Sequence, residues 1–261
     1  MAKVINDNQD NHVLETLLNH KSVRSYTDRK PSDEIIHKVV RAGQQAPFAS
    51  QLYSVLLKRE GNFPFGAPLL FTICVDFHKM EKIMEKRNWQ AVTNDLSILL
   101  MGIQDAALMS ENMVIAGASL GLGSCYLGAA PYRADKIIEE YNLPERVFPL
   151  VQLVMGYPAE DKPPRPRYPM NFVLFEDEYP ELDDEKVKEA MEIMDEGYLA
   201  QDYYKGLNAM IPIKDDDRED NYTFENYSWT EHISRKWGQR HPDPERILEQ
   251  FRKCGFEIER N

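Results

Sequence analysis

Two short cationic segments stand out in an acidic chain. Residues 20–26 (HKSVRSY) and 165–169 (RPRYP) concentrate positive charge, whereas the whole 261-residue chain carries a formal net charge of −12. Crowded like charges repel one another, so a bound anion is one explanation for each segment. The first segment also offers a hydroxyl and backbone N–H groups, and a phosphate group binds to such cations and short donors. The alternative is an ordinary surface turn with solvated charges, because charged side chains are mostly exposed.

The composition argues against several other classes of partner. The negative net charge argues against general affinity for nucleic acid or for anionic membranes. Cys74, Cys125 and Cys254 are far apart and form neither a disulfide framework nor a zinc motif, which predicts a reducing, cytoplasmic location. The segment 1–11 is polar and shows no signal peptide. We assign no catalytic side chain and no metal ligand from the sequence.

The most apolar stretch, residues 95–120, predicts a long helix. Four polar residues interrupt it, so it lacks the run of roughly 20 apolar residues that a membrane span needs. Asn94 is expected to cap the helix at its start. A helix that is apolar nearly all round lies in a core or is shared with a second subunit. The interrupting residues are Gln104, Asp105, Glu111 and Asn112.

The remaining elements predict an α+β fold in which helices cover a central sheet. Ser32 is expected to cap the second of the predicted helices. We also predict two parts, a core over 1–175 and a helical extension over 176–261 that packs on the core or on a dimer partner. The predicted helices are 11–19, 32–45, 133–141, 183–196, 229–237 and 244–253, and the predicted strands are 52–58, 69–76, 124–127, 148–155 and 172–175.

Several familiar enzyme motifs do not fit the chain. Residues 121–123 (GLG) resemble part of a dinucleotide fingerprint, but the third glycine is misplaced and the motif follows a helix instead of a strand. We interpret Gly121 as part of a helix stop, where glycine is free to adopt a positive φ. There is no P-loop, no Gly-x-Ser-x-Gly elbow and no His-Glu-x-x-His zinc motif.

Five short motifs together resemble the nitroreductase family of FMN-dependent oxidoreductases. Segment 20–26 is similar to the family's Arg-Arg-Ser-x-Arg signature with its following aromatic residue, and segment 46–52 (APFASQL) falls where the family has its Ala-Pro-Ser-Ser flavin loop. Segment 119–128 (SLGLGSCYLG) resembles the glycine-rich stretch after the central helix. Segments 165–169 and 229–233 (WTEHI) are similar to the oxygen-insensitive nitroreductase and flavin reductase branch. The motifs occur in the family's order over nearly the whole chain.

The resemblance implies a nitroreductase-like α+β fold with a mostly antiparallel sheet, a long central helix and a C-terminal helical extension. It also implies a homodimer whose subunits share two flavin sites. The residues implied to hold the FMN phosphate and pyrimidine edge are His20, Lys21, Ser22 and Arg24, and those implied to close on the phosphate are Arg167 and Arg165. Ser50 and Gln51 would reach the flavin from the partner subunit, with Phe48 in the same loop, and the backbone of Leu127, Gly128 and Ala129 would line the ring.

The implied activity is hydride transfer from NADPH or NADH through FMN to a small acceptor. In this ping-pong scheme the nicotinamide reduces the flavin and leaves, and a nitroaromatic, a quinone or free flavin takes its place. Two other classes stay open: an FMN enzyme of the same fold with different chemistry, such as reductive dehalogenation or azoline oxidation, and a flavin-binding protein without turnover. The physiological acceptor is not specified by the sequence.

The chain departs from the family pattern at three places. Phe48 stands where the family commonly has serine, and Ala129 stands where it has glycine. The stretch 214–227 is acidic where the similar branch carries arginines that would meet the 2′-phosphate of NADPH. Because carboxylates repel a phosphate, we expect a weakened preference for NADPH and acceptance of NADH. The alternative is an exposed acidic loop that touches no substrate.

Overall fold

The computed structural model describes residues 11–214, 218–241 and 243–258. The chain forms two compact units, one made of Met1–Lys162 with Asp243–Asn261 and the other of Pro163–Pro242. The C-terminal segment therefore belongs to the first unit. The division into 1–175 and 176–261 stays a prediction.

The first unit is built on a four-stranded sheet whose order is β1-β2-β4-β3. Every pair of neighbouring strands is antiparallel, which agrees with the predicted sheet. The central strand β2 is buried at all of its positions because helices or loops cover both of its faces. The strands are β1 (Tyr53–Lys58), β2 (Leu69–Asp76), β3 (Gly123–Leu127) and β4 (Val147–Gly156).

Three helices of the first unit begin at a capping side chain, and the caps at Ser32 and Asn94 are the predicted ones. The side chains of Asn11, Ser32 and Asn94 each accept hydrogen bonds from backbone N–H groups of the first helical turn. The predicted starts of these three helices are therefore confirmed. The helices of this unit are α1 (His12–Leu18), α2 (Asp33–Gly43), α3 (His78–Lys86), α4 (Asp95–Ser119), α5 (Ala134–Tyr141) and α9 (Pro244–Lys253), with short 3-10 turns at η1 (Pro64–Gly66) and η2 (Ala130–Arg133).

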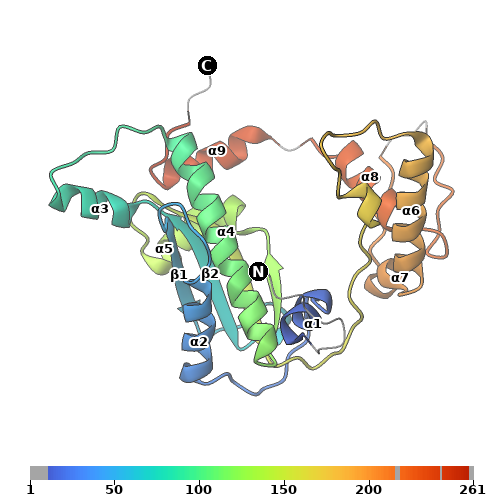
Figure 1. The fold of residues 1–261 in the computed structure, drawn as a ribbon, viewed down its shortest axis with the longest axis horizontal. Helices are drawn as coiled ribbons and strands as arrows, with labels where there is room; N and C mark the ends of the chain where they lie inside the picture. The colour runs from blue at the N-terminus through green and yellow to red at the C-terminus, as the bar shows by residue number, and fades with distance from the viewer. Residues whose placement is uncertain (1–10, 215–217, 242, 259–261) are drawn as a thin grey trace, which may run out of the picture. The chain divides into compact units, whose positions relative to one another are not determined.

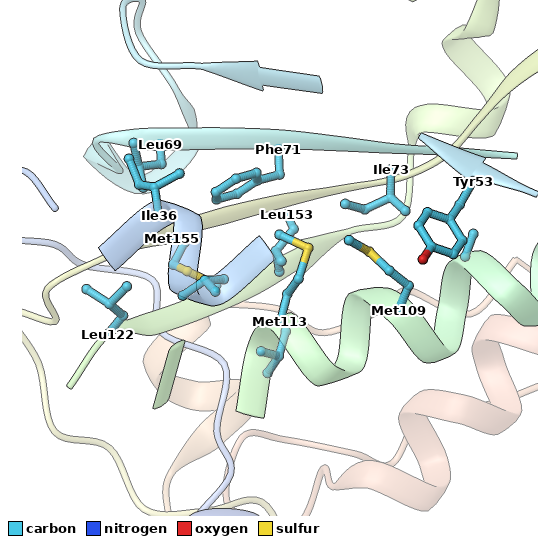
Figure 2. Packing of buried hydrophobic residues seen from close by; sticks show 13 residues of the cluster. Ile36, Tyr53, Leu69, Phe71, Ile73, Met109, Met113, Leu122, Leu153 and Met155 are labelled. Carbon is cyan, nitrogen blue, oxygen red and sulfur yellow. The ribbon is translucent and has the colours of Figure 1, made fainter. Parts of the chain in front are cut away.

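The long helix α4 crosses one face of the sheet beside α2 (Figure 1). Figure 2 shows Met113 of α4 directed toward Leu153 and Met109 directed toward Ile73, within one buried cluster. Among the described residues, α4 alone is long and apolar enough to cross a membrane, and half of its most apolar window is buried. Its burial against the sheet fits the core helix that the sequence predicts.

The described residues of the second unit form three helices and an aromatic core. Tyr198, Tyr204 and Tyr227 are buried together, and Trp229 packs against this cluster. Tyr198 and Tyr204 stack with ring centroids 5.8 Å apart, so aromatic contacts hold this small unit together. Its helices are α6 (Asp184–Leu199), α7 (Tyr203–Leu207) and α8 (Trp229–Gly238), with a 3-10 turn at η3 (Met170–Phe172).

Three elements differ from the sequence expectation. The predicted strand at 172–175 is wrong, because η3 occupies Met170–Phe172 and the next residues continue a turn. The N–H groups of Val173 and Leu174 both donate to the carbonyl of Met170, at 3.1 and 2.9 Å, so local bonds satisfy the backbone. Helices α3 and α7 were not predicted, because both are short and α3 buries none of its residues.

Arg146 joins three parts of the first unit. Its guanidinium donates to both Asp95 oxygens, at 2.9 and 2.7 Å, to Glu81 at 3.0 Å, and to the carbonyl of Gly255 at 2.7 Å. It thereby connects α3, the start of α4 and the segment after α9. Burial raises the pKa of the Asp95 carboxyl, but hydrogen bonds from Arg146 and from the N–H of Glu257 outweigh that effect and lower the pKa below its usual range.

We expect the substitution Arg146→Met to destabilise the protein by about 2–4 kcal/mol, because it leaves the half-buried carboxylates without their partner. Chemical denaturation of both proteins measures this difference. Since Asp95 contributes stability above its unfolded pKa of ~3.9, the difference should shrink as the pH falls below that value.

The matched control is Arg59→Met, which removes an exposed ion pair with Asp33. This control should cost no more than ~1 kcal/mol. Equal losses for the two variants would contradict the role given to Arg146.

Candidate functional site

The cationic segment 20–26 is held along the edge strand β3. The backbone N–H of Val23 donates to the carbonyl of Ser124 at 2.8 Å, and Ser22 and Ser124 form a parallel bridge. Tyr26 forms an antiparallel bridge with Pro158, which follows β4. These backbone contacts bring the predicted phosphate-binding residues next to the strand that leads to Leu127–Ala129.

Two glycines make this arrangement possible. A Cβ atom on Gly123 would lie 2.5 Å from Cγ2 of Val23, so only glycine permits this close approach. Gly121 has a φ of 77°, directly after the C-cap of α4. The predicted helix stop at Gly121 is therefore confirmed.

Alternation along the backbone divides the predicted cationic residues between two sides. A cavity of about 690 Å³ lies between α1, the end of α4 and the start of β3, and Lys21 and Val23 line it. Ser22 and Arg24 do not belong to its lining, as expected when successive residues of an extended segment point in opposite directions. His20 also lines the cavity. The candidate residues of this segment therefore face two different environments.

Two carboxylates lie against the same segment. The Lys21 ammonium group forms an ion pair with Asp161, and the backbone N–H of Arg24 donates to the Glu160 carboxylate at 2.6 Å. Both acidic residues line the cavity with Lys21. The Lys21 ammonium group lowers the pKa of the Asp161 carboxyl through its hydrogen bond and its charge. The candidate site therefore contains acidic as well as basic side chains, whereas the sequence motif indicated only basic ones.

The predicted ring-lining residues follow the end of β3. Leu127 is partly buried against a cluster that includes Phe63 and Cys125. A Cβ atom added to Gly128 would meet nothing within 4 Å, and its φ lies outside the left-handed region. Neither packing nor backbone conformation within this chain therefore requires glycine at this position. The backbone at Gly128 is open to close approach by a ligand, which fits the predicted contact with a flat ring.

Asp105 organises the loop that contains Phe48, Ser50 and Gln51. This buried carboxylate of α4 accepts the backbone N–H groups of Ala49, Ser50 and Leu52 at 2.7, 3.0 and 3.0 Å. Three such bonds fix a loop in which Gln51 has a φ of 54°. Sequence reasoning assigned no role to Asp105, although a carboxylate in the middle of an apolar helix was the available signal.

The loop that Asp105 holds presents its side chains outward. Phe48 is 51% exposed, Gln51 is exposed and Ser50 is half-buried. The Ser50 hydroxyl lies 3.6 Å from the Met101 sulfur, beside the exposed face of α4. These side chains therefore point away from their own core, as residues that serve a neighbouring molecule would.

Tyr126 attaches β3 to α4 next to the predicted ring-lining residues. Its hydroxyl donates to Oγ of Ser110 at 3.0 Å and lies 3.4 Å from a carboxylate oxygen of Glu111. Burial raises the pKa of Tyr126 to about 12, so the hydroxyl stays protonated at neutral pH. Sequence reasoning gave this tyrosine no role.

Arg165 and Arg167 lie in the second unit and differ in their contacts. The Arg165 guanidinium donates to the side chain of Gln201 and stacks 3.9 Å from the Tyr203 ring centroid. Arg167 is exposed and donates to the carbonyls of Arg165 and Pro166, at 2.8 and 3.1 Å. Of the two, Arg167 has the more accessible charge. This agrees with the larger role that the resemblance gives it.

The acidic stretch before α8 is only partly described. Asp215, Asp216 and Asp217 lie outside the described residues, and Glu219 is exposed. Asp220 forms two hydrogen bonds of 2.7 Å with Arg235, so its charge is balanced within the unit. The described part of the stretch is therefore less negative than its composition indicates.

His232 makes its contacts within the second unit. Its Nδ1 lies 3.1 Å from the Tyr227 hydroxyl, and its ring stacks on Tyr204 with centroids 4.4 Å apart. Burial lowers the pKa of His232 below its usual range, which favours the neutral ring. Trp229 packs on Tyr168, so the Trp-x-x-His segment belongs to the unit's core.

Known proteins similar to this chain share one family. A model of the nitroreductase family matches residues 56–157. The FMN reductase (NADPH) of Bacillus subtilis strain 168 is 32% identical over 212 residues, which cover 75% of this chain and 84% of that protein. The Cr(VI) reductase of Pseudomonas sp. strain G-1 is 35% identical over 182 residues, covering 64% of this chain and 75% of that protein.

Solved structures agree with these sequence relatives. The hypothetical oxidoreductase YcnD from Bacillus subtilis matches with a TM-score of 0.79 and 28% identity, over 96% of this chain and all of that chain. The nitroreductase-like α+β fold that the sequence predicts is therefore confirmed. With a relative more than 30% identical over most of both proteins, the chain belongs to the nitroreductase family.

Proposed function

We propose that this chain is an FMN-dependent NAD(P)H oxidoreductase that reduces small acceptors such as nitroaromatics, quinones or free flavin. The observation that carries the proposal is the attachment of the cationic segment 20–26 to β3, the strand that ends directly before the open backbone at Gly128. Related proteins named FMN reductase and oxygen-insensitive NADPH nitroreductase support the same activity. FMN would supply the two-electron chemistry that links nucleotide and acceptor.

The residues of the first unit fit the parts of FMN. Lys21 would balance the phosphate charge, Ser22 and Arg24 on the other side of the segment would meet the pyrimidine edge, and the backbone at Gly128 would face the ring. Loop residues held by Asp105 would orient the flavin, and the neighbouring apolar surface would exclude water from it. The phosphate contact of Arg167 stays a prediction, and Arg165 supports its own loop through Gln201. No side-chain acid or base is assigned to the reaction.

The visible absorption spectrum of the purified protein tests the function. We expect the bands of oxidised FMN, and we expect both NADPH and NADH to bleach them without oxygen.

Because Asp220 and Glu231 balance the charge of Arg235, this arginine is not free to pair with a 2′-phosphate. We therefore expect kcat/KM values for the two nucleotides within about tenfold of each other, a difference of ~1.4 kcal/mol or less.

Two results would oppose these expectations. A colourless protein that takes up no added FMN would refute the cofactor assignment. A preference for NADPH well above tenfold would refute the nucleotide expectation and leave the flavin chemistry intact.

A methyl group at position 128 should weaken flavin binding without lowering the stability of the protein. We expect Gly128→Ala to leave the melting temperature unchanged, because the new Cβ meets no protein atom. The same methyl group would clash with a closely packed ring at a cost of about 1–3 kcal/mol, so FMN should bind roughly 5- to 150-fold more weakly. Calorimetry and flavin titration measure the two effects.

Gly123→Ala is the control variant with which Gly128→Ala is compared. Its new Cβ collides with Val23, so this variant should lose stability. Unchanged FMN affinity in a stable Gly128→Ala protein would exclude a ring contact at Gly128.

We also propose that the protein is a homodimer with shared flavin sites. Helix α4 exposes the apolar side chains of Leu96, Leu100, Met101 and Leu108, and exposed apolar side chains of this kind suit a permanent interface. Ser50 lies against Met101 at this surface, so Ser50 and Gln51 of the partner subunit would be close to the interface.

The three unpaired, buried cysteines support a cytoplasmic location.

The paired substitutions Leu100→Glu and Leu108→Glu test the homodimer. We expect sedimentation to show a dimer for the unmodified protein and a monomer for the variant, because buried unpaired charges oppose association. FMN affinity should fall in the monomer if the partner contributes to the site. Leu207→Glu, at another exposed leucine, should stay dimeric, and a dimeric α4 variant would contradict the proposed interface.

A further inference from the structure

Two neighbouring carboxylates bind cationic and N–H donor groups that a phosphate would also bind. Asp161 pairs with the ammonium group of Lys21, and Glu160 accepts the backbone N–H of Arg24 at 2.6 Å. A carboxylate and a phosphate present similar anionic oxygen acceptors to such donors. These acidic residues therefore engage donors that a bound anion would also use.

The two carboxylates differ in how firmly the protein holds them. The Lys21 side chain is 28% exposed, whereas the Asp161 side chain is 92% exposed, so the carboxylate lies on the solvent side of the pair. An anion that enters the cavity and approaches Lys21 meets Asp161 there, since both residues line it. Glu160 instead holds the backbone of the cationic segment and is needed for its position.

We propose that Asp161 is an internal competitor for the flavin phosphate. It pairs with Lys21 in the flavin-free protein, releases Lys21 when FMN binds, and so weakens the affinity for FMN. The proposal rests on the proposed function, because it concerns the same flavin site. Its consequence is that FMN exchanges between the protein and solution more readily than it would with a neutral residue at position 161.

Flavin titrations of Asp161→Asn test the competition. Intrinsic fluorescence of the full chain, freed of flavin, measures the Kd for FMN and for riboflavin, which lacks the phosphate. We expect the FMN Kd to fall by about three- to tenfold, because one ion pair no longer has to open and one like charge is gone. The riboflavin Kd should not change, and ~1 M salt should remove most of the FMN effect.

Glu140→Gln is the matched control. It removes one negative charge from another exposed ion pair, with Lys58, and should leave both affinities unchanged. Because the Asp161 side chain is almost fully exposed, we expect Asp161→Asn to fold, and its melting temperature checks this. Asp161→Ser, which also removes the charge, should give the same decrease in the FMN Kd.

The other possible results would refute either this inference alone or the proposed function as well. An FMN Kd that is unchanged or higher in Asp161→Asn refutes the competition, and so does an equal decrease for riboflavin. If the unmodified protein binds FMN but charge at position 161 has no effect, only this inference fails. If it binds no FMN at all, the proposed function fails with it.

Discussion

The arrangement of the site depends on how the free edge of β3 is covered. An edge strand exposes unpaired N–H and C=O groups, and segment 20–26 satisfies part of that edge through the bridge of Ser22 with Ser124 and the N–H of Val23. The same contact fixes the cationic side chains relative to the sheet, because the backbone and not the side chains makes it. A glycine at position 123 is the steric condition for this approach. Sheet pairing and anion chemistry are thus joined in one short segment.

Helix α4 serves both the core and the site. Its buried face packs Met109 and Met113 on the strands, and its buried carboxylate, Asp105, holds the loop of Phe48, Ser50 and Gln51. A charge in an apolar helix is costly unless it is fully hydrogen-bonded, and three backbone donors meet that condition. The loop is therefore fixed by the same rigid element that supports the sheet. Precise sites are built on elements of this kind.

Most of the fold could be predicted from sequence, because its signals are local. Caps at Ser32 and Asn94, and the apolar strands, each act within a few residues of where they occur. The strand predicted at 172–175 failed because a run of apolar residues near Pro169 closes into a 3-10 turn instead. Apolar runs of this length do not distinguish these outcomes.

The site was less accessible to sequence reasoning, because its decisive contacts join distant residues. The cationic character of segment 20–26 was visible, but the carboxylates opposite it are about 140 positions further along the chain. Asp105 and the loop it holds are separated by more than 50 residues. A sequence motif identifies which donors are present, and only the fold shows which of them are already engaged.

The burial of the cysteines has a chemical consequence for an enzyme that handles quinones. Quinones are electrophiles that alkylate thiolates, and Cys74, Cys125 and Cys254 are all buried and unpaired. Burial raises the pKa of the Cys254 thiol to about 12 and also raises that of Cys74, so both remain protonated. Their sulfur atoms are thus shielded from the compounds the protein would reduce. Such a catalyst would resist covalent inactivation by its own substrates.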